Sequence, residues 1–268
     1  MVRTHIPLLL ALLATSPAYA AEPLHLQPAG PWRVDYTEES CLLSRPFAAG
    51  GGRYNLVVTF EPLQSKAWMR LSSPALVKRR DDEQIKLDVD GVPLREPVHM
   101  NIFKAPTSGS IREILFKDFR GQAARAEKSL RFRSVRHGDV EIEVPGLAKA
   151  MTSVGTCVDD LHSSLGIAPE LPRSIKSWPE GFAGTFLELP FIPNGGSFSY
   201  RMLYWVAPDG KVDQCQLLAA TRDSKFDSNA CAQLKKKGKF VPARDVAGAT
   251  VRAPVYDNAT VRVTVISN

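Results

Sequence analysis

The sequence predicts an α+β protein in two parts, a β-rich domain closed by one helix and then a small β-β-α-β-β domain. Three observations carry this prediction. Short apolar runs with period-two alternation precede residue 145, one amphipathic helical stripe follows it, and the C-terminal segment reads as a hairpin, a capped helix and two more strands. The length of 268 residues also suits two domains.

The N-terminus reads as a cleavable signal peptide. Arg3 supplies a positive charge before the apolar run 6–13, and the small residues Ala18 and Ala20 occupy the −3 and −1 positions of a cleavage site. The alternative, an uncleaved anchor, needs about 20 apolar residues, whereas Pro17 interrupts this segment. We therefore expect residues 1–20 to be removed after Ala20, with export to the periplasm and no integral membrane segment afterwards.

Residues 21–168 form the predicted β-rich domain. Ile85, Leu87 and Val89 alternate with polar residues, and a hairpin turning at 136–138 has Gly138 available for a left-handed conformation. In this hairpin we expect Arg131 and Arg133 to lie near Glu143 and Glu141. The helix that closes the domain is indicated by an apolar stripe with steps of three and four residues: Leu147, Met151, Val154, Val158, Leu161 and Leu165.

Residues 169–196 are the expected linker, because five prolines and Gly195–Gly196 exclude a long helix. The segment is too apolar for a solvated tether, so we expect it to lie extended against one or both domains.

Residues 197–268 contain the clearest pattern. Strands 200–206 and 212–218 flank the turn 208–210, and Asp227 is the expected N-cap of a helix over 228–237. A strand near 250–256 and a terminal strand with Val261, Val263 and Val265 inward complete the β-β-α-β-β order.

The four cysteines imply two disulfides in an oxidising compartment, and they can pair in three different ways. No pair has the CxxC spacing of redox or zinc sites. Cys215 lies in the second strand of the predicted hairpin and Cys231 in the helix that should cover it, so we expect these two to pair. Cys41–Cys157 then follows by exclusion.

The C-terminal segment resembles the TonB C-terminal domain family over about residues 197–268. The resemblance rests on Asp209–Gly210, on Phe226–Asp227 and on Phe240-Val241-Pro242-Ala243 followed by Gly248. Three features depart from the family. Ala220-Thr221-Arg222 replaces a common Ser-Ser-Gly, Phe226 stands where Leu is usual, and we expect a cleavable signal and a β-rich domain where TonB energisers carry an uncleaved anchor and a Pro-Lys/Glu spacer. The N-terminal region resembles uncharacterised secreted proteins of Gram-negative bacteria, through 30–45 and 145–161.

This resemblance implies a non-enzymatic periplasmic binding or adaptor protein with a protein or peptide partner, such as an outer-membrane receptor in transport. The expected peptide-binding edge is the terminal strand, since exposed edges accept an added strand. It comprises Val261, Arg262, Val263, Thr264 and Val265. The alternative is that this strand is interior or already paired with the first domain.

No residue pattern predicts catalysis, a cofactor or a metal. Asp159, His162, Ser163 and Ser164 are neighbours on one helix, which cannot supply the separate elements of a Ser-His-Asp site. Gly50–Gly52 and Asp81–Glu83 read as turns. The formal charge of +6 is spread along the chain, and its dense clusters, 78–80 and 235–237, read as solvated faces rather than a nucleic-acid site. Two alternatives remain, a cell-envelope hydrolase and, if the signal is retained, a membrane-anchored TonB-type energy transducer.

Overall fold

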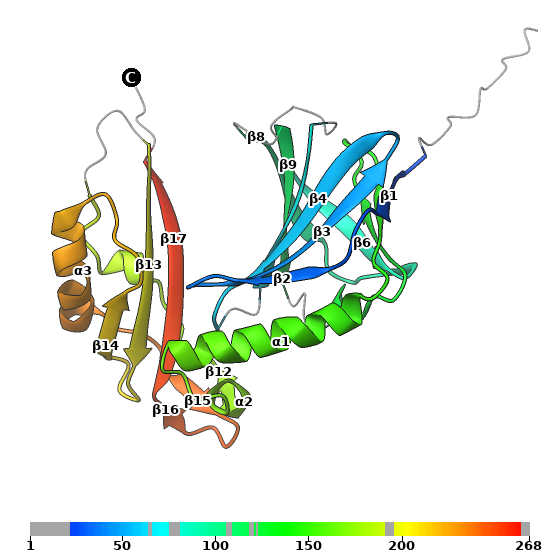
Figure 1. Cartoon of the computed structure of the whole chain (residues 1–268). Coiled ribbons are helices and arrows are strands. Elements are labelled where there is room, and N and C mark those ends of the chain that lie inside the picture. The colour runs from blue at the N-terminus through cyan, green and yellow to red at the C-terminus, as the bar shows by residue number, and fades with distance from the viewer. Residues whose placement is uncertain are drawn as a thin grey trace, which may run out of the picture.

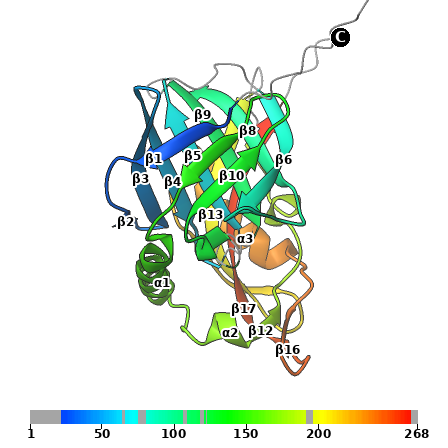
Figure 2. The ribbon, with the colours of Figure 1, turned by 90° about the vertical axis from the view of Figure 1, so that its right-hand side faces the viewer.

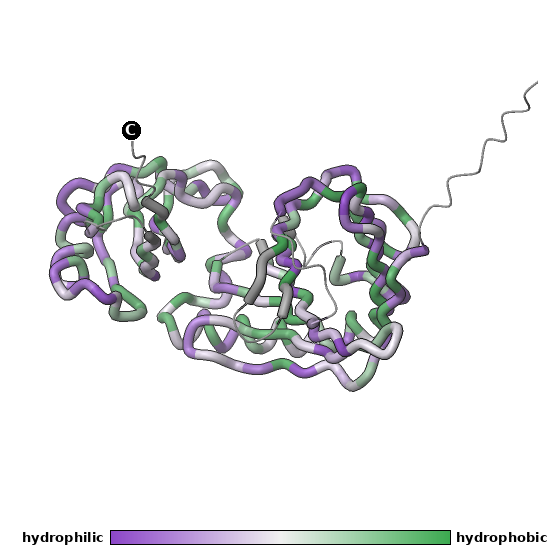
Figure 3. The backbone as a smooth tube through the Cα atoms, turned by 90° about the horizontal axis from the view of Figure 1, so that it is seen from above, coloured by the Kyte–Doolittle hydropathy of each residue, from purple (hydrophilic) through white to green (hydrophobic). Residues whose placement is uncertain are grey.

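The structure is a computed structural model that describes residues 22–63, 66–74, 81–105, 109–117, 121, 123–190 and 196–263. It is mainly β, with a barrel from the first half of the chain beside a sheet from the second half (Figure 1). Viewed from above, these two bodies lie side by side (Figure 3). The expected signal peptide and its cleavage site lie outside the described residues.

Nine strands form a closed barrel in the order β1-β11-β10-β6-β8-β9-β5-β4-β3. The ring closes because β1 pairs with β11 in parallel, Leu24 opposite Val140, and with β3 antiparallel, Gln27 opposite Ala48. β2 (Arg33–Tyr36) and β7 (Val92–Pro93) add to β3 and β6. The nine strands are β1 (Leu24–Pro28), β3 (Cys41–Ala49), β4 (Gly52–Phe60), β5 (Lys66–Ser73), β6 (Asp81–Val89), β8 (Val98–Ala105), β9 (Gly109–Lys117), β10 (Ser129–Arg133) and β11 (Val140–Glu143).

The barrel is filled by apolar side chains. Successive residues of a strand point to opposite faces, so Leu56, Val58 and Phe60 of β4 lie inside while Val57 and Thr59 lie outside. Met69 and Ile114 of the neighbouring strands β5 and β9 join them in one buried cluster. The barrel interior is therefore a core, and its outer wall is the surface on which a site can form.

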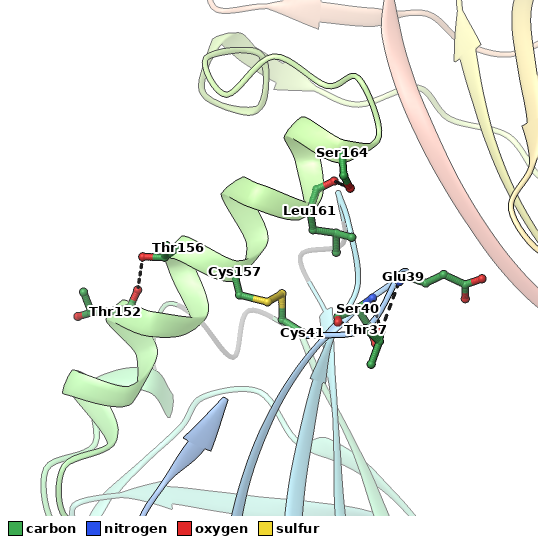
Figure 4. Close-up of a disulfide and its surroundings, with 9 residues drawn as sticks. All are labelled: Thr37, Glu39, Ser40, Cys41, Thr152, Thr156, Cys157, Leu161 and Ser164. Carbon is green, nitrogen blue, oxygen red and sulfur yellow. Dashed lines mark hydrogen bonds between the residues drawn. A yellow bond between two sulfur atoms is a disulfide. The ribbon is translucent and has the colours of Figure 1, made fainter. Parts of the chain in front are cut away.

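Helix α1 (Leu147–Ser164) runs beneath the barrel in the view of Figure 1 and packs against its core. The predicted apolar stripe is confirmed, because Leu147, Val154, Val158 and Leu161 are buried in the barrel core. A disulfide between Cys157 of α1 and Cys41 at the start of β3 fixes the helix there (Figure 4).

The second body is built on the three-stranded sheet β14-β13-β17, with β13 at Gly196–Val206, β14 at Val212–Leu217 and β17 at Ala253–Val263. Helix α3 (Ser224–Lys237) packs on one face through Phe226, Ala230 and Leu234. The disulfide Cys215–Cys231 links β14 to α3. Both disulfides have the pairing expected from the sequence.

The segment between the bodies packs onto the second one. α2 (Leu171–Ser174) precedes β12 (Ile175–Ser177), which joins a small sheet with β15 (Ala243–Asp245) and β16 (Thr250–Val251). Short 3₁₀ turns occur at η1 (Ala123–Arg125) and η2 (Ala183–Thr185), and Ala183 is fully buried in the second core. Figure 2 shows α2 and β12 below the barrel.

The predicted fold class is wrong. The first body is a closed barrel, and hydrogen bonds of β1 rather than a helix close it. The second body is not a small β-β-α-β-β domain, because the expected strand 250–256 is divided between the two-residue strand β16 and the start of the long strand β17, which runs on through Val261 to Val263. These outcomes depend on pairings between distant segments, which leave no local pattern in the sequence.

Several local expectations also change. α3 begins at Ser224 because the carboxylate of Asp223, not Asp227, accepts a hydrogen bond from Phe226 N at 2.7 Å. Asp81–Glu83 is the start of strand β6 rather than a turn. In the β10–β11 hairpin Gly138 has the expected positive φ, 71°. Its charged pairs differ from those expected.

In this hairpin Arg131 bonds to Asp139 and Arg133 to Asp88 of β6. The strand pairing does place Arg131 opposite Glu141, as expected, but both arginines bond to other carboxylates because the neighbouring strand β6 and the hairpin turn bring nearer partners to them.

The two disulfides are predicted to stabilise the protein unequally. In the chain-entropy model a bridge closing a loop of about 15 residues contributes about 3 kcal/mol, and one closing a loop of about 100 residues contributes about 4.7 kcal/mol. The bridges here span 116 and 16 positions. Replacing Cys41 and Cys157 by Ala should therefore lower the unfolding free energy, measured in urea, more than replacing Cys215 and Cys231. An equal or reversed order would contradict this prediction.

Candidate functional site

A groove of about 1670 Å³ lies between the outer wall of the barrel and the C-terminal sheet. One side is formed mainly by outward residues of β3, β4, β5, β6, β8 and β9, together with the β2–β3 turn and the ladder partners Asp81 and Ile102. The other side is formed by Arg201 of β13 and three residues of β17. We call this the interdomain groove.

The barrel side of the interdomain groove carries a polar row across four adjacent strands. Arg70 lies opposite Glu113, Glu113 opposite Asn101, and Asn101 opposite Asp82. Arg70 Nε donates to Glu113 Oε2 at 2.6 Å. Trp68, two residues from Arg70 on the same face, adds a half-buried indole to the wall. Because neighbouring strands lie about 4.8 Å apart, Asp82 sits roughly 10 Å from Glu113 across the row.

The opposite side is the face of the C-terminal sheet that α3 leaves uncovered. Tyr256, Asn258 and Thr260 of β17 line the groove, while the odd-numbered residues Val255 and Ala259 pack against the core under α3. This alternation follows from the period of two along a strand. The β17 residues that reach the groove are therefore those with even numbers.

Polar contacts connect the two sides. Asn258 Nδ2 donates to Glu61 Oε1 at 2.5 Å, and Arg201 forms an ion pair with Glu39. Glu39 extends from the β2–β3 turn toward the C-terminal sheet (Figure 4). That turn is held by Thr37, whose Oγ1 accepts from Ser40 N at 2.9 Å. Both barrel carboxylates are thus presented by short segments next to strand ends.

An apolar contact outside the groove lining supports these bonds. Leu203 and Trp205 of β13 are buried against Ile167, with Leu63 and Leu165 packed beside them. Leu63 has a φ of 57°, unusual for a residue with a side chain. Its backbone N–H donates to His162 Nε2 at 3.3 Å, which fixes the loop that carries Glu61.

Carboxylates outnumber cations in the interdomain groove. Its described lining includes Glu39, Glu61, Asp81, Asp82 and Glu113 against two guanidinium groups, those of Arg70 and Arg201.

Burial changes the acidity of two groups that line the groove. It raises the pKa of Glu61, although the hydrogen bond from Asn258 and the charge of Arg70 oppose this shift. Burial also raises the pKa of Tyr256 to about 12, with the nearby Glu61 adding to the effect. The pKa of Asp81 is lowered, mainly by its hydrogen bond with His137. Glu61 therefore carries its negative charge in a partly desolvated place with a neutral hydrogen-bond donor, the amide of Asn258.

Strand β17 forms one edge of its sheet. Within the described part of the chain it pairs only with β13, over all eleven residues of β17. Val261, Arg262 and Val263 of the expected peptide-binding edge belong to β17, whereas Thr264 and Val265 lie outside the described residues. The edge extends further back along the chain than the sequence predicted, to Ala253.

The residues weighed for catalysis are not assembled into a site. Ser163 Oγ donates to Asp159 O and Ser164 Oγ donates to Leu161 O, so both hydroxyls are bound to their own helix. His162 is buried and accepts from the Leu63 backbone. Gly50 and Gly51 form the β3–β4 turn with positive φ angles. Among the described residues no group of three or more His, Cys, Asp and Glu side chains could hold a metal ion.

Searches against known protein families, curated proteins and solved structures give no match to this chain. The resemblance to the TonB C-terminal domain family therefore rests on the motif residues alone. In the structure Gly210 of that motif has a positive φ of 83°, and its carbonyl accepts from Phe240 N at 2.8 Å. A Cβ at this glycine would lie 2.3 Å from the Phe240 carbonyl oxygen. The Asp209–Gly210 motif and the motif that begins at Phe240 are therefore in direct contact.

Glu61 should make stability depend on pH. Burial raises the pKa of Glu61 in the folded state, so the folded protein holds the proton of this carboxyl group more tightly than the unfolded chain does. The stabilisation that results is present in acid and is lost as the pH rises through the folded-state pKa. Glu61→Gln keeps an oxygen for Asn258 and removes the charge. We expect its melting temperature to exceed that of the wild type by about 1–2 °C at neutral pH, and the difference to disappear in acid.

The matched control is Glu113→Gln, which breaks the ion pair with Arg70 and should give no gain at neutral pH. A Glu61→Gln variant that is less stable than the wild type at neutral pH would contradict the prediction.

Proposed function

We propose that the protein is a non-enzymatic binding protein of the cell envelope that takes an extended peptide segment along the edge of β17. The observation that carries this proposal is the placement of an edge strand beside the interdomain groove. A peptide that added to this edge would obtain main-chain hydrogen bonds from β17. Alternate side chains of the peptide would face the groove, on the side of Tyr256, Asn258 and Thr260.

The arrangement of the groove favours binding over catalysis. Its polar side chains are engaged in contacts that hold the two bodies together, such as Asn258 with Glu61 and Arg201 with Glu39. Contacts that exist before the partner arrives reduce the entropy lost on binding. The barrel, which has an apolar interior, would then serve as a rigid wall against which the bound segment lies.

Two further points support the proposal. The resemblance of residues 197–268 to the TonB C-terminal domain family favours a peptide partner, such as a segment of an outer-membrane receptor. The two disulfides are compatible with export to an oxidising compartment, the periplasm in this proposal. No helix among the described residues is both long and apolar enough to cross a membrane.

The proposal is tested by selecting peptides of about ten residues, the upper length of common strands, from a random displayed library. The bait is the chain from Ala21 to Asn268. Enriched peptides are synthesised with and without N-methylation at alternate backbone amides, and their affinities are measured by fluorescence anisotropy.

Strand addition predicts that methylation of one alternating set of amides weakens binding about tenfold or more, roughly 1.4 kcal/mol, while methylation of the other set has little effect. A library that yields no enriched peptide, or peptides whose binding is equally insensitive to both sets, would count against the proposal.

A further inference from the structure

The groove differs in charge from the molecule as a whole. The chain carries a formal charge of +6, yet the described lining of the interdomain groove holds five carboxylates and two arginines. Both arginines are engaged, Arg70 with Glu113 and Arg201 with Glu39. The arginines therefore neutralise two carboxylates and leave Glu61, Asp81 and Asp82, of which Asp81 bonds to His137 and Arg136.

Asp82 and Glu61 are the groove carboxylates that form no hydrogen bond or ion pair with a cationic side chain in the described part of the chain, although the charge of Arg70 acts on Glu61 and opposes part of its desolvation. Asp82 is exposed at the end of the polar row, and none of the described residues donates a hydrogen bond to its carboxylate. Among the described residues Glu61 accepts from the neutral amide of Asn258, and burial raises its pKa. A cation placed beside Glu61 would offset this desolvation.

The aromatic lining suits the same kind of ligand. Trp68 lies on the barrel side between Thr59 and Leu115 across the strands, with its indole half-buried. The long apolar stems of Lys and Arg pack on such surfaces while their charged ends reach nearby carboxylates. A ring face also attracts a cation directly.

The spacing of the groove matches an extended chain. Side chains on one face of a strand recur every two residues, roughly 7 Å apart. A segment added to β17 would therefore present every second side chain toward the barrel wall, where Glu61 lies near Asn258 and Asp82 ends the polar row. Because this wall carries carboxylates, it favours positively charged side chains on the bound segment.

We propose that the segment bound in the interdomain groove carries lysine or arginine at alternate positions, and that Glu61 and Asp82 receive these cations. This inference rests on the proposed function, because it takes the segment to be added to β17. It names the chemistry of the partner, a basic extended peptide, which neither the resemblance nor the β17 edge alone implies.

The test uses three labelled peptides of about ten residues that share Thr and Val at one set of alternate positions and carry Lys, Gln or Glu at the other set. Affinities for the chain from Ala21 to Asn268 are measured by fluorescence anisotropy at low and at high salt. We expect the Lys peptide to bind about tenfold or more tightly than the Gln peptide, the Glu peptide to bind least, and the advantage of Lys to shrink in about 0.5 M salt.

Protein variants locate the site. Glu61→Gln with Asp82→Asn should reduce the preference for Lys over Gln to about threefold or less. The control is Asp209→Asn with Glu188→Gln, which removes the same charge from two exposed carboxylates outside the groove lining. The control should leave the preference unchanged. Both variants are compared by melting temperature, so that a loss of folding is recognised separately.

The outcomes separate the two proposals. Equal binding of the Lys and Gln peptides, with alternating sensitivity to N-methylation, would overturn the basic partner and leave strand addition intact. A Lys preference that both variants reduce equally would overturn the role of Glu61 and Asp82. Failure of all three peptides and of the random library would overturn both proposals together.

Discussion

The position of the C-terminal sheet against the barrel depends on one apolar contact, the packing of Leu203 and Trp205 on Ile167. These side chains lie on the face of β13 that α3 leaves uncovered, and their burial brings Arg201 and Asn258 to Glu39 and Glu61. The hydrogen bond of Asn258 to Glu61 and the ion pair of Arg201 with Glu39 are partly exposed, and each contributes about 1 kcal/mol or less. The interdomain groove and the placement of β17 beside the barrel therefore follow from the burial of a few apolar residues near the end of α1.

The same arrangement divides the two faces of the C-terminal sheet between stability and binding. Odd-numbered residues of β17 such as Val255 and Ala259 pack under α3, and even-numbered residues face the groove. His162 shows a similar division in the barrel body. Its ring does not belong to a catalytic site but accepts from the Leu63 backbone and holds the loop that carries Glu61. His162, which the sequence predicts to be a structural residue, thus helps to position Glu61 in the groove.

Local patterns predicted the local parts of the structure. The stripe of α1, the turn at Gly138, the β13–β14 hairpin and both disulfides follow from spacings within short segments or from exclusion. The barrel and the groove could not be predicted in this way. Closure requires β1 to meet both β11 and β3, and the bond between Asn258 and Glu61 joins residues 197 positions apart. Pairings of this kind are selected by the whole core, and a single sequence contains no periodicity that marks them.

Addition of an extended segment to the edge of β17 can be measured by hydrogen exchange with mass spectrometry. The chain from Ala21 to Asn268 is compared with and without a saturating basic peptide. We expect slower exchange of backbone amides within β17, Ala253–Val263, because an added strand supplies hydrogen bonds to the edge. Slower exchange confined to the barrel strands, or no change in β17 at saturation, would contradict strand addition.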